Sequence, residues 1–226
     1  MSKVVNRGVI IALFIGLAAM SGGAHAQNSV ADLLAELSQY EYDDVRIPLR
    51  EAHLWVTAAL NSDQDSIAVA GALATLLDGD ATLDCKLFVC RQLARVGGAA
   101  EVPALAALLN NADTADMARI ALEAIQGPEA DAALIEALET TSGAVRVGVI
   151  NSVGERGAKD AVSSLRRLAK NGDADEAEAA VAALGKIGTR GAAHALKRAK
   201  RGASPALREA IENAQCVCEA TRRGRN

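Results

Sequence analysis

Four cysteines are the residues of this 226-residue sequence whose chemistry depends most on spacing. Cys85 and Cys90 lie in a stretch with helical periodicity. On one helix this spacing separates their Cα atoms by about 8 Å, beyond the limit of roughly 7 Å for a disulfide. We therefore expect both to be buried thiols that act as small apolar side chains.

Cys216 and Cys218 flank a single valine. We predict that the last helix ends near Gln215, which leaves the backbone at this pair free to bend. Three states stay open for it: a strained local disulfide, a cross-link between two chains, and two reduced thiols. Cys216 and Cys218 are therefore the candidate disulfide or reactive thiols of the sequence.

Catalytic and metal-binding patterns are sparse elsewhere. Beyond residue 26 the only histidines are His53 and His194, near opposite ends of the chain. No Cys/His spacing suits zinc or haem. The Gly97-Gly98 pair follows a helix-like run instead of a strand, so it is typical of a helix cap and not of a phosphate-binding loop. We predict no catalytic residue, no metal ligand and no cofactor.

The elements that must position these residues form a repeat. Half of the residues are apolar but only 2% are aromatic, which favours thin, repeated helical layers over one thick core. Each copy has a β-branched anchor close to a glycine, followed nine residues later by Leu or Val. The anchors are 29, 28 and 34 residues apart: Val96, Ile125, Val153 and Ile187. This period predicts helix pairs whose turns lie near residues 97, 127, 155 and 188, with left-handed glycine caps and no β-sheet.

The two ends of the mature chain differ from the repeats. Residues 27–80 contain nearly all large aromatics, including Trp55, and predict atypical capping helices over 30–40, 45–60 and 66–78. Residues 81–202 carry the repeats. Residues 203–226 predict a helix that begins at Ser204-Pro205 and a polar tail.

The repeats resemble a known family. The segments "CRQLARVG" at 90–97, "MARIALEAI" at 117–125 and "AVAALGKIGTRGAAHAL" at 180–196 are similar to HEAT repeats, of the short type shared with phycobilin lyases and exported bacterial HEAT-repeat proteins. The resemblance implies an all-α, right-handed solenoid of stacked antiparallel helix pairs that serves as a scaffold for protein contacts. HEAT repeats often carry an Asp/Arg ladder between layers. Here Asp175 and Arg146 are isolated candidates, so we expect the packing between layers to rest mainly on Ala, Val and Leu contacts.

Acidic and basic residues are distributed unevenly along the chain. Residues 27–140 hold 19 acidic and 6 basic residues, whereas 141–226 hold 9 acidic and 16 basic residues. In the resembled family the second helix of each pair lines the concave face. The later second helices predict a partner-binding groove for an acidic protein, formed by Arg166, Arg167, Lys170, Lys197, Arg198, Lys200 and Arg201. The alternative is a solvated surface without a partner. Nucleic acid is disfavoured because the basic half lacks stacking aromatics.

The first 26 residues have the pattern of a secretory signal peptide. Lys3 and Arg7 precede an uncharged apolar run at 9–20, and Ala24-His25-Ala26 supplies a cleavage site. The run is too short for a membrane anchor, so we predict export to the periplasm or outside the cell, without membrane insertion after cleavage. The sequence thus predicts an exported, non-catalytic protein-interaction scaffold. The alternatives are a lyase-like or cofactor-handling protein, implied by the resemblance, and a thiol-redox or thiol-linked assembly protein.

Overall fold

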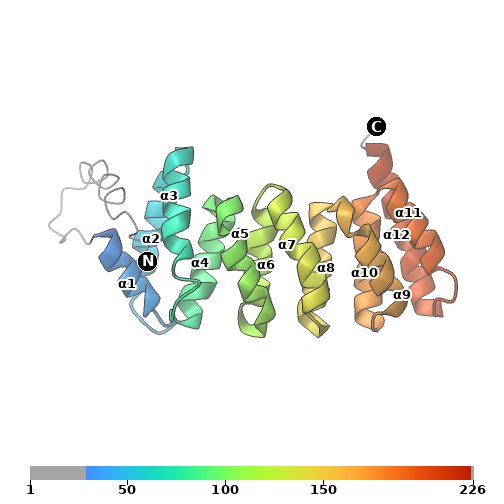
Figure 1. The fold of residues 1–226 in the computed structure, drawn as a ribbon, viewed down its shortest axis with the longest axis horizontal. Helices are drawn as coiled ribbons and strands as arrows, with labels where there is room; N and C mark the ends of the chain where they lie inside the picture. Colours follow the sequence, from blue (N-terminus) through green and yellow to red (C-terminus); the bar gives the residue numbers. More distant parts are fainter. Residues whose placement is uncertain (1–28, 225–226) are drawn as a thin grey trace, which may run out of the picture. The chain divides into compact units, whose positions relative to one another are not determined.

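The computed structural model describes residues 29–224, which contain helices and turns and no β-strand (Figure 1). The chain divides into two compact units, one within residues 29–97 and one within 98–224. The predicted all-helical fold is confirmed. The predicted signal peptide and its cleavage site lie outside the described residues.

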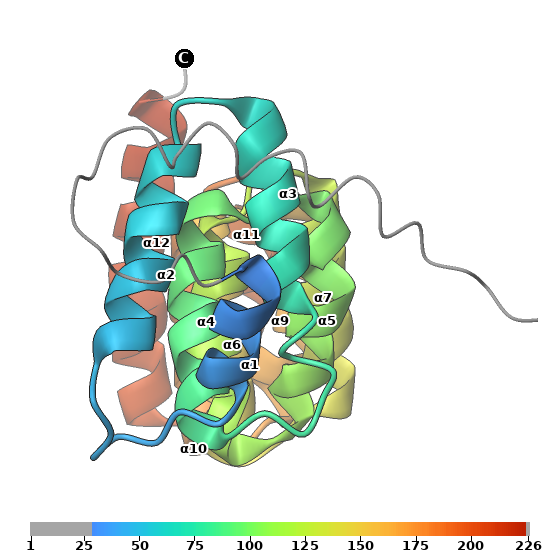
Figure 2. The same ribbon diagram turned by 90° about the vertical axis from the view of Figure 1, so that its left-hand side faces the viewer.

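The first unit contains four helices. They are α1 (Val30–Ser38), α2 (Ile47–Ala59), α3 (Asp63–Ala74) and α4 (Leu83–Val96). In Figure 2, α1 lies in front of α2 and α3. The core is built from aliphatic residues such as Leu37, Leu73 and Leu93, while Trp55 is half-buried and Tyr42 is 69% exposed. Arg95 of α4 donates to Thr57 Oγ1 of α2 over 3.1 Å and so joins two helices of this unit.

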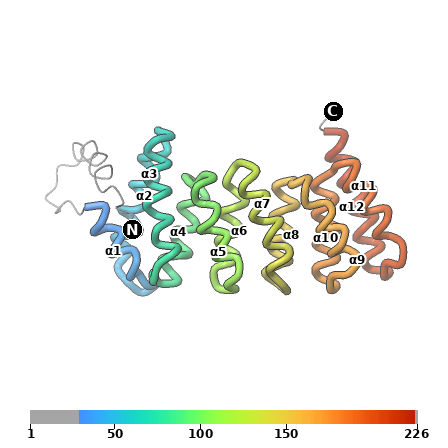
Figure 3. Tube along the Cα trace, viewed as in Figure 1, coloured from blue at the N-terminus to red at the C-terminus, as the bar shows by residue number. Residues whose placement is uncertain are grey.

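The second unit contains eight α-helices and three short 3-10 segments, which Figure 3 traces from green to red. They are η2 (Ala99–Glu101), α5 (Val102–Ala107), η3 (Leu108–Asn110), α6 (Ala112–Ala124), α7 (Pro128–Thr140), α8 (Gly143–Arg156), η4 (Lys159–Ala161), α9 (Val162–Asn171), α10 (Ala174–Ile187), α11 (Arg190–Ala199) and α12 (Pro205–Gly224).

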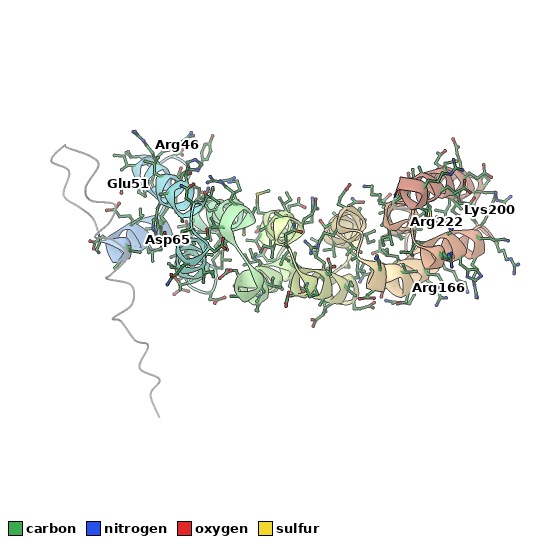
Figure 4. All side chains as sticks on the ribbon, turned by 90° about the horizontal axis from the view of Figure 1, so that it is seen from above. Arg46, Glu51, Asp65, Arg166, Lys200 and Arg222 are labelled. Atoms are coloured by element: carbon green, nitrogen blue, oxygen red, sulfur yellow. The ribbon has the colours of Figure 1, made fainter. Side chains whose placement is uncertain are left out.

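These helices form two rows, which Figure 4 shows from above. In the first row α6 packs on α8, α8 on α10, and α10 on α12. In the second row α5 packs on α7, and α9 on α11. Along the chain, helices of the first and second rows alternate and are joined by short turns. The unit is therefore a stack of helix pairs.

Local capping explains where several helices begin. The side chains of Asn111, Asp173 and Thr189 accept backbone N–H groups at the starts of α6, α10 and α11. Proline occupies the first turn of α5 and α7, where its missing N–H costs no hydrogen bond. These are sequence signals that act within one turn of helix.

The helix ends confirm the predicted turns but correct their chemistry. Gly157 and Gly188 adopt left-handed conformations at the ends of α8 and α10, as a glycine C-cap requires. Gly97 has φ −68° and ψ 151°, so it ends α4 in an extended conformation and is not a left-handed cap. The predicted end of the last helix near Gln215 is wrong, because α12 continues to Gly224.

Glycines inside helices bring the first row close together. Gly154 lies within α8, and a Cβ built there would be 2.8 Å from Ala183 Cα of α10. A Cβ at Gly185 of α10 would be 2.9 Å from the Ala214 carbonyl oxygen of α12. Such distances are too short for carbon atoms in contact. These two glycines therefore set the spacing of three neighbouring helices.

Arginines also link the helices of the first row, in addition to the expected aliphatic contacts between the layers. Arg119 of α6 donates to Ser152 Oγ of α8 over 3.3 Å. Arg146 of α8 forms an ion pair with Glu176 of α10 at 3.1 Å, and Glu176 is buried. The ladder partner of Arg146 is thus Glu176 and not its neighbour Asp175.

Arg156 is the most extensively bonded of these side chains. Its Nη1 donates to the carbonyls of Leu122 and Glu123 at 3.0 and 2.9 Å and also to that of Ile125. Its Nε forms an ion pair with Asp131 of α7. A cation at this position satisfies carbonyls at the end of α6 and offsets the negative end of its helix dipole. Arg156 therefore joins α8 to the preceding helix pair.

Candidate functional site: a cationic seam in the second row

The seam is the line along which α9 and α11 pack side by side. Leu165, Leu168 and Ala169 of α9 are buried, as are Ala195 and Leu196 of α11. Because an α-helix returns to the same face every three to four residues, the polar residues between them point outward. The seam is thus an exposed boundary between two amphipathic helices.

The first hollow of the seam lies where α9 and α11 begin, and its volume is about 710 Å³. Val162 and Ala195 supply apolar lining. The polar lining consists of Lys159, Asp160, Ser163, Arg166, Arg190 and His194. Three basic side chains, those of Lys159, Arg166 and Arg190, thus share the hollow with one carboxylate, which makes it electropositive.

The second hollow lies where α9 ends, next to the start of α10 and the connection from α11 to α12. Its volume is about 480 Å³. Lys170 and Arg201 line it together with Asp173 and Glu178, so its charges are balanced. The remaining walls are mostly small and apolar: Ala169, Ala174, Ala177, Ala199, Ala203, Ala206 and Leu207.

The structure separates the seven predicted groove residues into groups. Arg166 lines the first hollow, and Lys170 and Arg201 line the second. Figure 4 shows Arg166 projecting from the outer side of the second row. Lys197 and Arg198 are exposed but line neither hollow.

Two of the predicted residues are engaged within the chain. Arg167 forms an ion pair with Glu139 of α7, and Lys200 forms one with Glu212 of α12 at 2.8 Å. These contacts hold the pKa values of both carboxyls below their usual range, chiefly through the hydrogen bond from the cation. Arg167 and Lys200 are therefore less available to a partner than the cations of the hollows.

Sequence reasoning found Arg166 but missed the other two cations of the first hollow, Lys159 and Arg190, and also His194. Lys159 precedes α9, and Arg190 and His194 lie in the first half of α11. The spacing of four between Arg190 and His194 places both on one helix face, and this signal was available in the sequence.

The backbone at the second cysteine pair differs from the expected helix end, whereas Cys85 and Cys90 are buried as expected. Cys216 and Cys218 lie inside continuous helix α12, where residues two apart point about 200° away from each other. Cys216 is exposed, whereas Cys218 is 1% exposed with its Sγ 3.9 Å from the carbonyl oxygen of Thr189. All four cysteines are free thiols.

Burial controls the acidity of the inward-facing thiols. It raises the pKa of Cys85 to about 11 and that of Cys90 to about 12, and it also raises the pKa of Cys218. The thiolate is the reactive form of cysteine, so these three groups are chemically protected. Within residues 29–224 no cluster of His, Cys, Asp or Glu has the arrangement of a metal site. The same residues include no helix that is both long and apolar enough to cross a membrane.

Comparisons with known proteins agree with this architecture. Residues 131–215, from α7 to α12, match the model of the family described as HEAT repeats, and the matched part contains both seam helices. The predicted fold class, an all-α stack of helix pairs of the HEAT and armadillo kind, is confirmed. Among the curated proteins, none matches this sequence.

Three solved structures are similar to this chain at low sequence identity. The designed armadillo repeat protein YIII(Dq)4CqI is 17% identical, with 84% of this chain and 100% of that chain covered and a TM-score of 0.43. The designed armadillo repeat protein YIII(Dq.V1)4CPAF, in complex with the peptide (KR)4, is 15% identical, with 85% and 100% covered and a TM-score of 0.47. Human deoxyhypusine hydroxylase in complex with glycerol is 16% identical, with 91% and 88% covered and a TM-score of 0.43.

Proposed function

We propose that this chain is an exported, non-catalytic scaffold of short HEAT repeats that binds an acidic segment of another protein in the α9–α11 seam. The observation that carries the proposal is the first hollow, where Lys159, Arg166 and Arg190 face a single carboxylate, Asp160. None of these three cations forms an ion pair within residues 29–224.

The electrostatics favour an anionic partner over a neutral one. Exposed charges are screened beyond about 8 to 10 Å at physiological salt, so a single contact contributes little. Several cations in one hollow act together on a carboxylate that enters it, and arginine offers paired donors for both carboxylate oxygens. Binding should therefore depend on salt and on the cations of the hollow together.

The shape of the seam favours an extended protein segment. The hollows lie at opposite ends of α9, whose ten residues span about 15 Å. An extended chain of about five residues covers that length. No Phe, Tyr or Trp side chain lines either hollow, and stacking on such rings is the usual basis of binding to single-stranded nucleic acid.

Export is the part of the proposal that rests on the first 26 residues. Mass spectrometry of the protein isolated from its native host should find a mature chain that begins at Gln27. A chain that retains the residues before Ala26 in the cytoplasm would contradict export and leave the seam proposal to its own test.

The seam is tested with two variants of equal charge change. Arg166→Glu with Arg190→Glu removes two cations from the first hollow, whereas Lys197→Glu with Arg198→Glu reverses two exposed cations outside both hollows. The probe is a fluorescent peptide of alternating Glu and Ser, measured by anisotropy at low and high salt.

We expect the first variant to weaken binding by about tenfold or more and to flatten its salt dependence, and the second to change it by about twofold or less. Circular dichroism should show unchanged helicity for both. Equal losses in the two variants would show that only net charge attracts the peptide, which would overturn the proposed site.

A further inference from the structure

We infer that the seam binds a protein segment with two anchor side chains. An acidic side chain enters the first hollow, and an apolar side chain about four residues away enters the second. This inference rests on the proposed function and specifies the segment that the seam binds. It follows from the difference between the two hollows and from the distance between them.

The hollows differ in charge balance. The first has three basic side chains and one carboxylate, while the second has Lys170 and Arg201 together with Asp173 and Glu178. A carboxylate that entered the second hollow would meet as many like charges as opposite ones. The first hollow alone therefore selects for an acidic side chain.

The second hollow has walls suited to an apolar side chain. Ala169 and Ala177 are buried at its lining, and Leu207 is half-buried beside it. Alanine side chains are short, so the lining leaves about 480 Å³ open to a longer side chain from outside. The methylene stems of Lys170 and Arg201 can lie against such a group while their charged ends stay in solvent. A Leu side chain placed there loses contact with water and gains affinity.

The spacing follows from helix geometry. On α9, the first hollow is lined by residues from Val162 to Arg166 and the second by residues from Ala169 onward. The outermost lining residues of α9, Val162 and Lys170, are eight residues apart, which corresponds to roughly 12 Å along the axis. An extended segment rises about 3.3 Å per residue, so its two anchor side chains are about four residues apart at most. A helical ligand would instead need a spacing of about seven to eight residues.

Synthetic peptides test the motif. Each carries two adjacent Glu residues in a Ser/Gly background, with one Leu placed about two, four, six or eight residues away, or with Ser in place of Leu. We expect the spacing of about four to bind most tightly, by about tenfold over the Ser peptide. Anisotropy titrations measure each affinity.

Two protein variants locate the effect of the Leu residue. Ala206 is exposed and lines the second hollow, so Ala206→Trp should fill it, whereas Ala220→Trp places the same side chain on an exposed position of α12 outside both hollows. Ala206→Trp should abolish the tenfold advantage of Leu but keep the affinity for the Ser peptide. Ala220→Trp should keep both.

The outcomes separate this inference from the proposed function. If the Ser peptide binds and responds to Arg166→Glu with Arg190→Glu, but Leu adds nothing at any spacing, the motif is wrong and the function stands. An optimum at about eight residues, or a Leu advantage that survives Ala206→Trp, would also overturn the motif. If no peptide binds, both are overturned.

Discussion

The two helix rows of the second unit use arginine in opposite ways. In the first row, Arg156 and Arg146 are largely buried and bonded to neighbouring helices. In the second row, Arg166 and Arg190 line an open hollow without an ion-pair partner in the described chain. The row alone does not decide the role, because Arg167 of the second row is paired with Glu139, so the neighbouring helices around each arginine decide it.

The two rows also differ in how closely their helices pack. Gly154 and Gly185 let the first-row helices approach until no Cβ fits between them. In the second row, a Cβ built at Gly191 of α11 would meet its nearest neighbours at 3.7 Å, which is ordinary van der Waals contact. The first row is thus the structural layer, and the second row has room for a ligand. The following predictions test this contrast.

The largest effect should come from Arg156→Met. It removes the donors to the carbonyls at the end of α6 and leaves Asp131 without its cation, so the free energy of unfolding should fall by about 3 kcal/mol. Urea denaturation measures this change. The matched second-row variant, Arg166→Met, should change stability by about 0.5 kcal/mol or less. Similar losses in the two variants would contradict the division of roles.

A pair of glycine substitutions should give the next largest effect. Gly154→Ala places a Cβ 2.8 Å from Ala183 Cα, and separating α8 from α10 should cost about 1–3 kcal/mol. Gly191→Ala meets no such contact, and alanine's better helix propensity should leave stability unchanged or raise it by up to about 1 kcal/mol. Thermal unfolding of both variants measures the difference. A Gly154→Ala protein as stable as the wild type would mean that the first row is not closely packed.

Thiol alkylation probes α12 on its two faces. Cys216 is exposed and should react with iodoacetamide at least about tenfold faster than Cys218, whose pKa burial raises. At about pH 8, Cys85 and Cys90 should stay unmodified, because pKa values of about 11 and 12 leave them as thiols. Mass spectrometry of digested protein assigns each site. Equal labelling of Cys216 and Cys218 would show that α12 does not pack on the start of α11.

The smallest effect should come from the exposed pair of Arg167 and Glu139. Arg167→Gln should lower stability by about 0.5 kcal/mol or less, because solvent screens an exposed ion pair. The folded-state pKa of Glu139 is lowered, so the stabilisation is present above its unfolded pKa and is lost as pH falls through the folded value. The wild type and the variant should therefore converge in stability in acid. A difference that grows on acidification would contradict this assignment.

Much of the fold could be predicted from short stretches of sequence. The glycine near each anchor marks the turns near 97, 127, 155 and 188, since caps and apolar periodicity act within a few residues. The same signals gave a wrong prediction where glycine can serve either as a helix end or as a close contact between helices. Gly154 has the local pattern of a helix end, yet it lies inside α8 because it packs against a helix about thirty residues away.

The candidate site, too, could be predicted only in part from the sequence. The sequence alone determined that the later second helices are basic, because helical periodicity separates Leu165 and Leu168 from Arg166 and Lys170. Only the tertiary structure decided that Arg167 meets Glu139 while Arg166 faces Arg190 across the seam. Adjacent residues on a helix point about 100° apart, so which of them is neutralised depends on where the neighbouring helices lie. That placement comes from the close packing of the first row, which no local pattern in α9 records.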